Sequence, residues 1–352
     1  MSLVTHTLGY PRIGVARELK HAVEAYWAGK SSLDQLETVG RKLRARHWAE
    51  QQAAGLTFVT VGDFAYYDHI LDTSALLGAV PHRFGQADDT AVSLDTVFRM
   101  GRGRAPSGEP AAACEMTKWF DTNYHYMVPE LYPNQTFRIA RESLFEQVRE
   151  ARARGHAVKA VLPGPLTWLW LGKTQGEFDK LSLLDALLPV YTQVLSRLKE
   201  AGAEWVQLDE PILALDLPAT WKQAFEASYT HLKAAPVKKL LATYFGGLED
   251  NLGLAAGLPV DGLHVDLVRA PDQLTAVLDR VPAYKVLSLG VIDGRNIWRS
   301  DLPALRDALQ DVALRLGDRL WLAPSCSLLH VPQDLQGETE LDPELRSWLA
   351  FA

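Results

Sequence analysis

The sequence predicts an α/β fold, a (β/α)8 barrel of the TIM type with a long insertion after the second strand. Short apolar runs alternate with longer segments of helical periodicity, and the runs number eight. The chain of 352 residues also has the length of one large barrel. An open, doubly wound parallel sheet is the alternative, because strand counts from one sequence often err by one or two.

The eight apolar runs are the expected strands of the barrel. Their lengths suit strands, and most are followed by Gly, Pro or a carboxylate, residue types that favour a turn. The runs lie at His6–Leu8, Thr57–Val61, Val158–Leu162, Trp205–Leu208, Leu240–Tyr244, Gly262–Leu267, Val286–Val291 and Leu320–Ala323.

Two segments between these runs are strongly amphipathic. Leu183–Lys199 and Leu302–Leu316 carry apolar residues at helical spacing, as expected of helices that pack on a sheet. Pro189 lies within the first segment, so it must either start that helix or kink it. Leu341–Ala352 also has a helical pattern but no cap, which suggests a chain cut from something longer.

Residues 62–157 separate the second expected strand from the third. Most connections in compact domains are only a few residues long, and one of this length is often functional. It holds helix-like pieces and a loop, Gly101–Pro110. No low-complexity tract or linker divides the chain, so residues 1–352 are expected to form a single barrel domain.

Composition and motifs exclude several classes of protein. A formal net charge of -7 argues against nucleic acid as a partner, since phosphate binding needs a basic excess. No apolar run spans a membrane, and the N-terminus does not resemble a signal peptide. Cys114 and Cys326 form no disulfide framework, so a cytoplasmic location is expected. The sequence contains no phosphate loop, dinucleotide fingerprint or nucleophile elbow.

In a barrel of this type the functional site lies where the strands end. Asp209 and Glu210 are adjacent on an extended segment, so their side chains point to opposite faces and do not form an acid/base pair. His264 and Asp266 share a face, and with Cys326 they form a partial set of zinc ligands. Alternatively, His264 is a hydrogen-bonded core histidine and Cys326 a small buried residue.

Two further segments carry cations suited to an anionic ligand. Arg17 and Lys20 are three residues apart at the start of an expected helix, where free amides and the helix dipole favour carboxylates. Lys118 and Asn123 lie in a segment rich in aromatic residues, residues 115–126, that can grip a carboxylate and stack on a heterocycle. The alternatives are a solvated surface pair and an aromatic core strip with exposed polar ends.

These segments resemble the N-terminal domain of cobalamin-independent methionine synthase, over about residues 6–352. The resemblance is carried in order by Gly9-Tyr10-Pro11-Arg12, Arg17-Glu18-Leu19-Lys20, Val61-Gly62-Asp63-Phe64, Tyr67-Asp68, residues 115–126, Gly164-Pro165-Leu166-Thr167-Trp168-Leu169, Gln207-Leu208-Asp209-Glu210-Pro211, Gly262-Leu263-His264-Val265-Asp266 and Ser325-Cys326-Ser327-Leu328-Leu329-His330.

The resemblance implies methyl transfer from 5-methyltetrahydropteroyl-triglutamate to homocysteine, giving methionine, by two face-to-face barrels. The chain then corresponds to the N-terminal barrel, with the C-terminal catalytic barrel absent, and it is expected to be inactive alone. The residues that match the folate-binding segments of the family are Arg17, Glu18, Leu19, Lys20, Lys118 and Asn123. The folate and the C-terminal barrel are the expected partners, with no nucleic acid or membrane.

The resemblance also implies zinc in the full-length enzyme, with its ligands in the C-terminal barrel. The positions here that correspond to those ligands are Tyr244, Gly246, Asp266 and Cys326. Two of the four have no ligand side chain, so no catalytic residue and no metal are expected in this chain, and Asp266 and Cys326 are interpreted as vestigial. Two alternatives remain: a metal-dependent barrel hydrolase using Asp209 and His264 with this pair, and a non-catalytic folate-polyglutamate binding module.

Overall fold

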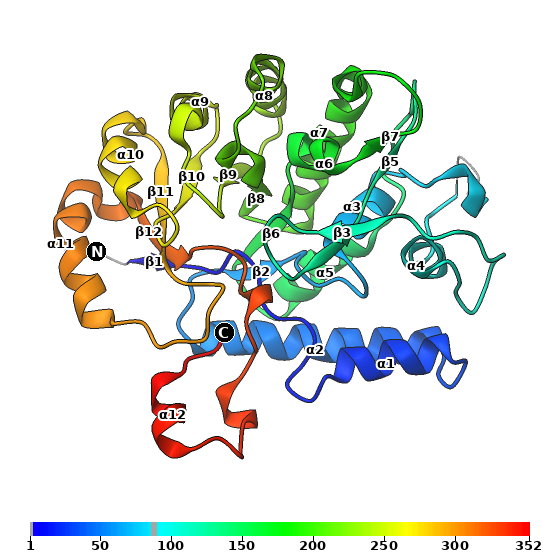
Figure 1. The fold of residues 1–352 in the computed structure, drawn as a ribbon, viewed down its shortest axis with the longest axis horizontal. Coiled ribbons are helices and arrows are strands. Elements are labelled where there is room, and N and C mark those ends of the chain that lie inside the picture. Colours follow the sequence, from blue (N-terminus) through cyan, green and yellow to red (C-terminus); the bar gives the residue numbers. More distant parts are fainter. Residues whose placement is uncertain (1–2, 86–89) are drawn as a thin grey trace.

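The computed structural model describes residues 3–85 and 90–352, and a parallel sheet of eight strands lies at its centre (Figure 1). From β2 to β12 each strand pairs with the next barrel strand along the chain, and β1 pairs with β12. The strands are β1 (Val4–Thr5), β2 (Val59–Val61), β6 (Val158–Pro163), β8 (Trp205–Asp209), β9 (Lys238–Ala242), β10 (Gly262–Asp266), β11 (Val286–Ile292) and β12 (Leu320–Pro324).

The two edges of this sheet, at β1 and β2, meet and close it into a barrel. The amide of Thr57 donates to the carbonyl oxygen of Thr5 at 2.9 Å, and the hydroxyls of Thr7 and Thr60 are 2.9 Å apart. A parallel sheet joined at its edges, with its strands in chain order, is a TIM-type barrel rather than an open doubly wound sheet. The predicted fold class is therefore confirmed.

The predicted bounds of the first strand are wrong. The strand was expected at His6–Leu8, but β1 covers Val4–Thr5, and only the amide of His6 extends its pairing, to Leu322. The next two backbone carbonyls are bonded to side chains instead of to a strand. The Thr7 carbonyl accepts from the Thr60 hydroxyl, and the Leu8 carbonyl accepts from the side-chain amide of Gln207. The other seven expected strands are present, with bounds shifted by two residues or fewer.

Helices cover the outside of the barrel between successive strands. Pro189 lies inside α7, five residues after its start, so it does not begin the helix. After β12 the described chain forms short 3-10 turns and the six-residue α12 (Pro343–Trp348), shorter than the expected terminal helix. The covering helices are α2 (Leu33–Ala53), α5 (Ser143–Ala153), α7 (Leu184–Ala201), α8 (Ala219–Leu232), α9 (Leu252–Gly257), α10 (Leu274–Arg280) and α11 (Leu302–Leu316).

The insertion between β2 and β6 is confirmed and builds a second hydrophobic cluster. In that cluster Val97 and Phe98 of the insertion pack with Leu19 and Tyr26 of α1 (Glu18–Trp27), the helix that precedes α2. The insertion itself contains α3 (His69–Leu76), α4 (Leu94–Arg102), β3 (Met116–Lys118), β4 (His125–Met127) and β5 (Glu130–Leu131). Strand β5 pairs with β7 (Lys173–Thr174), which follows α6 (Pro165–Leu171).

No helix in the described residues is both long and apolar enough to cross a membrane.

Candidate functional site

The two carboxylates at the end of β8 face opposite sides of the barrel wall, as the sequence predicts. Asp209 points inward, where it accepts hydrogen bonds from the Gln207 amide at 2.7 Å and the Tyr244 hydroxyl at 3.1 Å. Glu210 points outward and accepts from the backbone amide of Thr167 at 2.7 Å, in the first turn of α6. Burial raises the pKa of Glu210 to about 7. Glu210 is therefore a buried helix cap.

Lys159 lies inside the barrel beside Asp209, where it donates to the side-chain oxygen of Gln207. Burial raises the pKa of Asp209 and lowers the pKa of Lys159, and the attraction between the two charges opposes both shifts. Lys159 is completely buried, and its ammonium is bonded to protein. Lys159 and Asp209 are both buried and both bonded to Gln207, so they belong to the interior of the barrel rather than to a substrate site.

His264 is a core histidine. Its Nε2 lies 3.3 Å from the carbonyl oxygen of Ser325, and its Nδ1 lies 2.8 Å from the hydroxyl of Ser288, which is also 2.8 Å from Nε2 of His6. Because a carbonyl only accepts, the proton is on Nε2, and Nδ1 accepts from Ser288. Burial lowers the pKa of His264 to about 3, so its ring is neutral. Both ring nitrogens are already engaged in hydrogen bonds with the protein.

The partial ligand set seen in the sequence is not arranged to hold zinc. Asp266 accepts backbone hydrogen bonds from Phe245, Val268 and Arg269, at 3.0, 3.0 and 2.9 Å, and these engage both its oxygens. Burial raises the pKa of the Cys326 thiol, which disfavours the thiolate that binds metals.

The other two corresponding positions supply no ligand. The hydroxyl of Tyr244 donates to Asp209, and Gly246 has no side chain. Within residues 3–85 and 90–352, no three His, Cys, Asp or Glu side chains gather as a metal site. The residues present do not fit a zinc ion.

The β3–β4 hairpin covers the carboxyl end of the barrel. At its tip, Asp121 forms ion pairs with Arg269, which follows β10, at 3.0 Å and with Arg295, which follows β11, at 2.7 Å. The ring of Phe120 lies 5.7 Å from that of Phe245, which follows β9. The hairpin thus contacts the segments after three neighbouring strands and closes over the mouth.

The aromatic residues of this hairpin belong mainly to the core. Trp119 and Tyr126 are buried in the main hydrophobic cluster, while Lys118 and Asn123 are exposed. The interpretation as a core strip with exposed polar ends therefore describes the geometry, and Trp119 and Tyr126 present no free face for a flat heterocycle.

Arg17 and Lys20 lie at the start of α1, as the sequence predicts, and both are exposed. Arg17 is the N-cap residue in the left-handed region, with φ of 58°, and Lys20 is paired with Glu24 at 3.8 Å. An exposed lysine in so long a contact is available to another anion.

The two residues between these cations have structural partners. Glu18 accepts from the amide of Ala16 at 3.0 Å and from Arg46 at 2.8 Å. Its pKa is lowered, because these hydrogen bonds outweigh the opposing effect of burial. Leu19 is buried in the cluster between α1 and the insertion. Both residues hold the turn that presents Arg17 and Lys20.

Arg12 connects the two predicted anion-binding segments, although its place in the Gly9–Arg12 motif indicates no such role. Its guanidinium donates to the Tyr67 carbonyl at 2.8 Å and to the Tyr124 hydroxyl at 3.1 Å. Tyr124 in turn donates to Asp68 at 2.9 Å and follows Asn123 in the hairpin. The loop before α1 and the hairpin are therefore held together, and only the fold reveals this link.

The protein is thus a TIM-type barrel whose mouth is covered by a hairpin, with exposed cations on the hairpin and on the loop beside it. A family model for the N-terminal domain of cobalamin-independent synthases matches residues 4–317. The chain belongs to this family.

Several solved structures share this fold. A putative vitamin-B12-independent methionine synthase from Listeria monocytogenes has a TM-score of 0.67 at 15% identity, covering 99% of this chain and 96% of its own. A B12-independent methionine synthase from Shewanella sp. W3-18-1, in complex with selenomethionine, has a TM-score of 0.66 at 15% identity over 95% and 93%. A methyltransferase from Methanosarcina mazei has a TM-score of 0.58 at 14% identity over 93% and 88%. At these identities the likeness is one of fold.

Proposed function

We propose that this chain binds the tail of 5-methyltetrahydropteroyl-triglutamate as one half of an enzyme that transfers the methyl group to homocysteine and forms methionine. The observation that carries the proposal is the pair of exposed cationic segments that the Arg12–Tyr124 hydrogen bond links. A triglutamate tail is an extended string of carboxylates, and cations on two linked surface segments suit it.

Each predicted residue has a defined part in this proposal. Arg17, Lys20 and Lys118 bind tail carboxylates, and Asn123 hydrogen-bonds to the tail. Glu18 and Leu19 support the turn that holds the first two cations, through the contacts with Arg46 and the core. The covered mouth and the buried aromatic residues support a pterin position outside this barrel, against a partner.

That partner is, in the proposal, a second barrel of the same enzyme, which holds zinc and homocysteine. Asp266 and Cys326 are remnants of a related arrangement, because their polar groups serve backbone contacts and the core. This chain alone then binds and orients folate without activating a thiol. Two buried free cysteines agree with the reducing conditions of the cytoplasm.

Titration with the folate tests the binding role. Intrinsic fluorescence of this chain is followed as 5-methyltetrahydropteroyl-triglutamate or its monoglutamate is added. We expect the triglutamate to bind more tightly, and Lys20→Ala and Lys118→Ala each to weaken it by about tenfold. Lys199→Ala, on an exposed part of α7 away from both segments, is the matched control. Equal affinity for the two folates, or equal loss in the control, contradicts the proposal.

An activity assay and metal analysis separate the alternatives. Methionine formation is measured with this chain, zinc, homocysteine and the triglutamate, and no turnover is expected. Clear turnover contradicts the proposal that this chain alone is an inactive half of the enzyme. A stoichiometric metal content with hydrolase activity indicates the barrel hydrolase instead. A third outcome indicates a binding module: the chain binds the triglutamate tightly, and adding a second barrel that binds homocysteine neither strengthens this binding nor produces turnover.

A further inference from the structure

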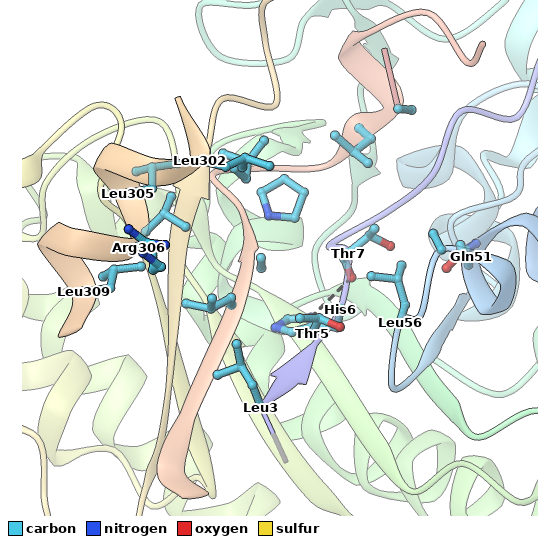
Figure 2. A pocket seen from close by; sticks show the side chains of 18 of the residues that line it. Leu3, Thr5, His6, Thr7, Gln51, Leu56, Leu302, Leu305, Arg306 and Leu309 are labelled. Atoms are coloured by element: carbon cyan, nitrogen blue, oxygen red, sulfur yellow. Dashed lines mark hydrogen bonds between the residues drawn. The ribbon is translucent and has the colours of Figure 1, made fainter. Parts of the chain in front are cut away.

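A large groove lies between α2 and α11, over β1 and β12, and Figure 2 shows the leucines of α11 along one side of it. Its volume is about 1350 Å³. The charged side chains that line it are engaged within the protein: Arg306 pairs with Asp307 at 2.8 Å, Glu50 with Arg46 at 3.8 Å, and Asp334 accepts from a backbone amide. The groove is therefore mainly apolar, in contrast to the end of α4.

The end of α4 and the residues after it form an arginine loop, Gly101–Arg104, with two guanidinium groups near each other. Nη1 of Arg102 donates to the backbone carbonyl of Arg104 at 3.1 Å. Burial and the neighbouring Arg104 lower the pKa of Arg102. Within residues 3–85 and 90–352, no carboxylate pairs with either guanidinium. Two like charges held near each other are stabilised by an anion that binds both.

The arginine loop is held in a fixed position. The guanidinium of Arg102 lies over the ring of Trp27, 4.3 Å from its centroid. Gly103 ends α4 in the left-handed region, with φ of 81°, and the hydroxyl of Tyr67 donates to the carbonyl oxygen of Gly101 at 2.9 Å. A guanidinium stacked in this way loses less freedom when it binds a ligand than an unsupported side chain does.

The residues that hold this loop also contact the proposed folate-binding segments. The ring of Tyr67 lies 6.1 Å from that of Trp27, and its backbone carbonyl accepts from Arg12 at 2.8 Å. Arg12 in turn donates to the hydroxyl of Tyr124 in the hairpin, at 3.1 Å. The arginine loop therefore adjoins the connection between the start of α1 and the hairpin.

One side of α1 leads from the predicted cations to the arginine loop. Lys20 and Trp27 are seven residues apart, so they lie on the same side of the helix, separated by about 10 Å along its axis. Glu24 is the carboxylate between them, and it is paired with Lys20 at 3.8 Å, a long and exposed contact. Cations thus lie at both ends of this side, Lys20 at one end and Arg102 at the other.

The chemistry of the tail matches this spacing and this pair of charges. An extended α-linked residue spans about 3.3–3.6 Å, and a γ-linked glutamate adds two carbon–carbon bonds to that, so two glutamates reach across about 10 Å. Each internal glutamate of a γ-linked tail has one free carboxylate, whereas the last glutamate has two. Two guanidinium groups suit two carboxylates, because each fork binds a carboxylate with paired hydrogen bonds.

We propose that Arg102 and Arg104 bind the last glutamate of the tail and so make the affinity of this chain depend on tail length. The proposal rests on the folate-binding role proposed above and adds a specificity site to it. The alternative is that Arg102 only covers Trp27 and neutralises the carboxyl end of α4, where a cation is favourable without any ligand.

Isothermal titration calorimetry with the mono-, di- and triglutamate forms of 5-methyltetrahydrofolate tests the proposal. For the parent chain we expect the affinity to rise with each glutamate. Arg102→Ala and Arg104→Ala should each weaken the triglutamate by about three- to tenfold, to about the affinity of the diglutamate, and change the monoglutamate by less than about twofold. Arg102→Lys keeps the charge without the fork, so its affinity should lie between those of the parent and Arg102→Ala.

The controls separate this inference from the folate role on which it rests. Arg280→Ala removes an exposed arginine from the last turn of another helix, α10, and should bind all three folates like the parent. Arg104→Ala, at an exposed position, keeps the test valid if Arg102→Ala does not fold. An unchanged preference for the triglutamate in the alanine variants overturns the inference and leaves the folate role standing. Equal affinity of the parent for all three folates contradicts the folate role, and the inference with it.

Discussion

Helices α7 and α11 have the same kind of amphipathic sequence but differ in what surrounds them. α7 packs between α5 and α8 and buries seven of its 18 residues, among them Tyr191 and Leu195. α11 has an open groove on one side and buries two of its 15 residues. The comparison teaches that an apolar stripe predicts a helix and its inward face, whereas the number of its neighbours depends on elements elsewhere in the chain.

The largest difference between the two helices is expected from truncating a buried leucine. Leu195 of α7 is completely buried, so Leu195→Ala removes packed atoms and leaves a cavity. We expect a loss of about 2–5 kcal/mol in the free energy of unfolding. Urea denaturation followed by circular dichroism measures it. A loss below about 1 kcal/mol would show that this side of the barrel is packed no better than the other.

Much of the fold was predictable because it depends on local patterns. The segments that become β6, β8, β10, β11 and β12 are short and mostly apolar, as expected of strands covered on both faces. The first strand was misplaced because the carbonyls of Thr7 and Leu8 are taken by side chains from β2 and β8, a contact that only the closed barrel creates.

The sequence predicts which residue types lie at the strand ends, but it does not predict their hydrogen-bond partners. Asp209 and Glu210 were assigned to opposite faces because alternation along a strand is a local property. The partners of His264 come from Ser288 and Ser325, more than 20 residues away, so no local pattern separates a core histidine from a ligand. The open face of α11 was unpredictable for the same reason, since it depends on the path of the chain after β12.

The two sides of the barrel should also respond to pH with opposite signs. His264 shares the Ser288 hydroxyl with His6, which lines the groove beside α11, and its folded pKa is about 3, below the unfolded value of about 6.5. Its contribution to stability is full above pH 6.5 and is lost as the pH falls toward 3. Glu210, on the side covered by α6 and α8, has a folded pKa of about 7, above its unfolded value, so its contribution is lost as the pH rises toward 7.

Two substitutions separate these contributions. Between about pH 4 and 6, His264→Gln should remove up to about 1.4 kcal/mol per pH unit from the rise of stability with pH. Glu210→Gln should steepen that rise between about pH 5 and 7, because it removes an opposing slope. Urea denaturation of the parent and both variants across this range measures the slopes, and contributions from other groups cancel in the differences. Parallel curves for the three proteins would refute the assignment.

The smallest effect is expected at the exposed end of α11. Leu314 is 76% exposed and lines the groove, so Leu314→Ala removes few contacts in the isolated chain. We expect a change within about 0.5 kcal/mol in the free energy of unfolding, against the several kcal/mol of Leu195→Ala on α7. The same denaturation experiment compares the two leucines directly. A loss of several kcal/mol for Leu314→Ala would contradict the comparison, because it would mean that this exposed end of α11 is packed as tightly as the buried face of α7.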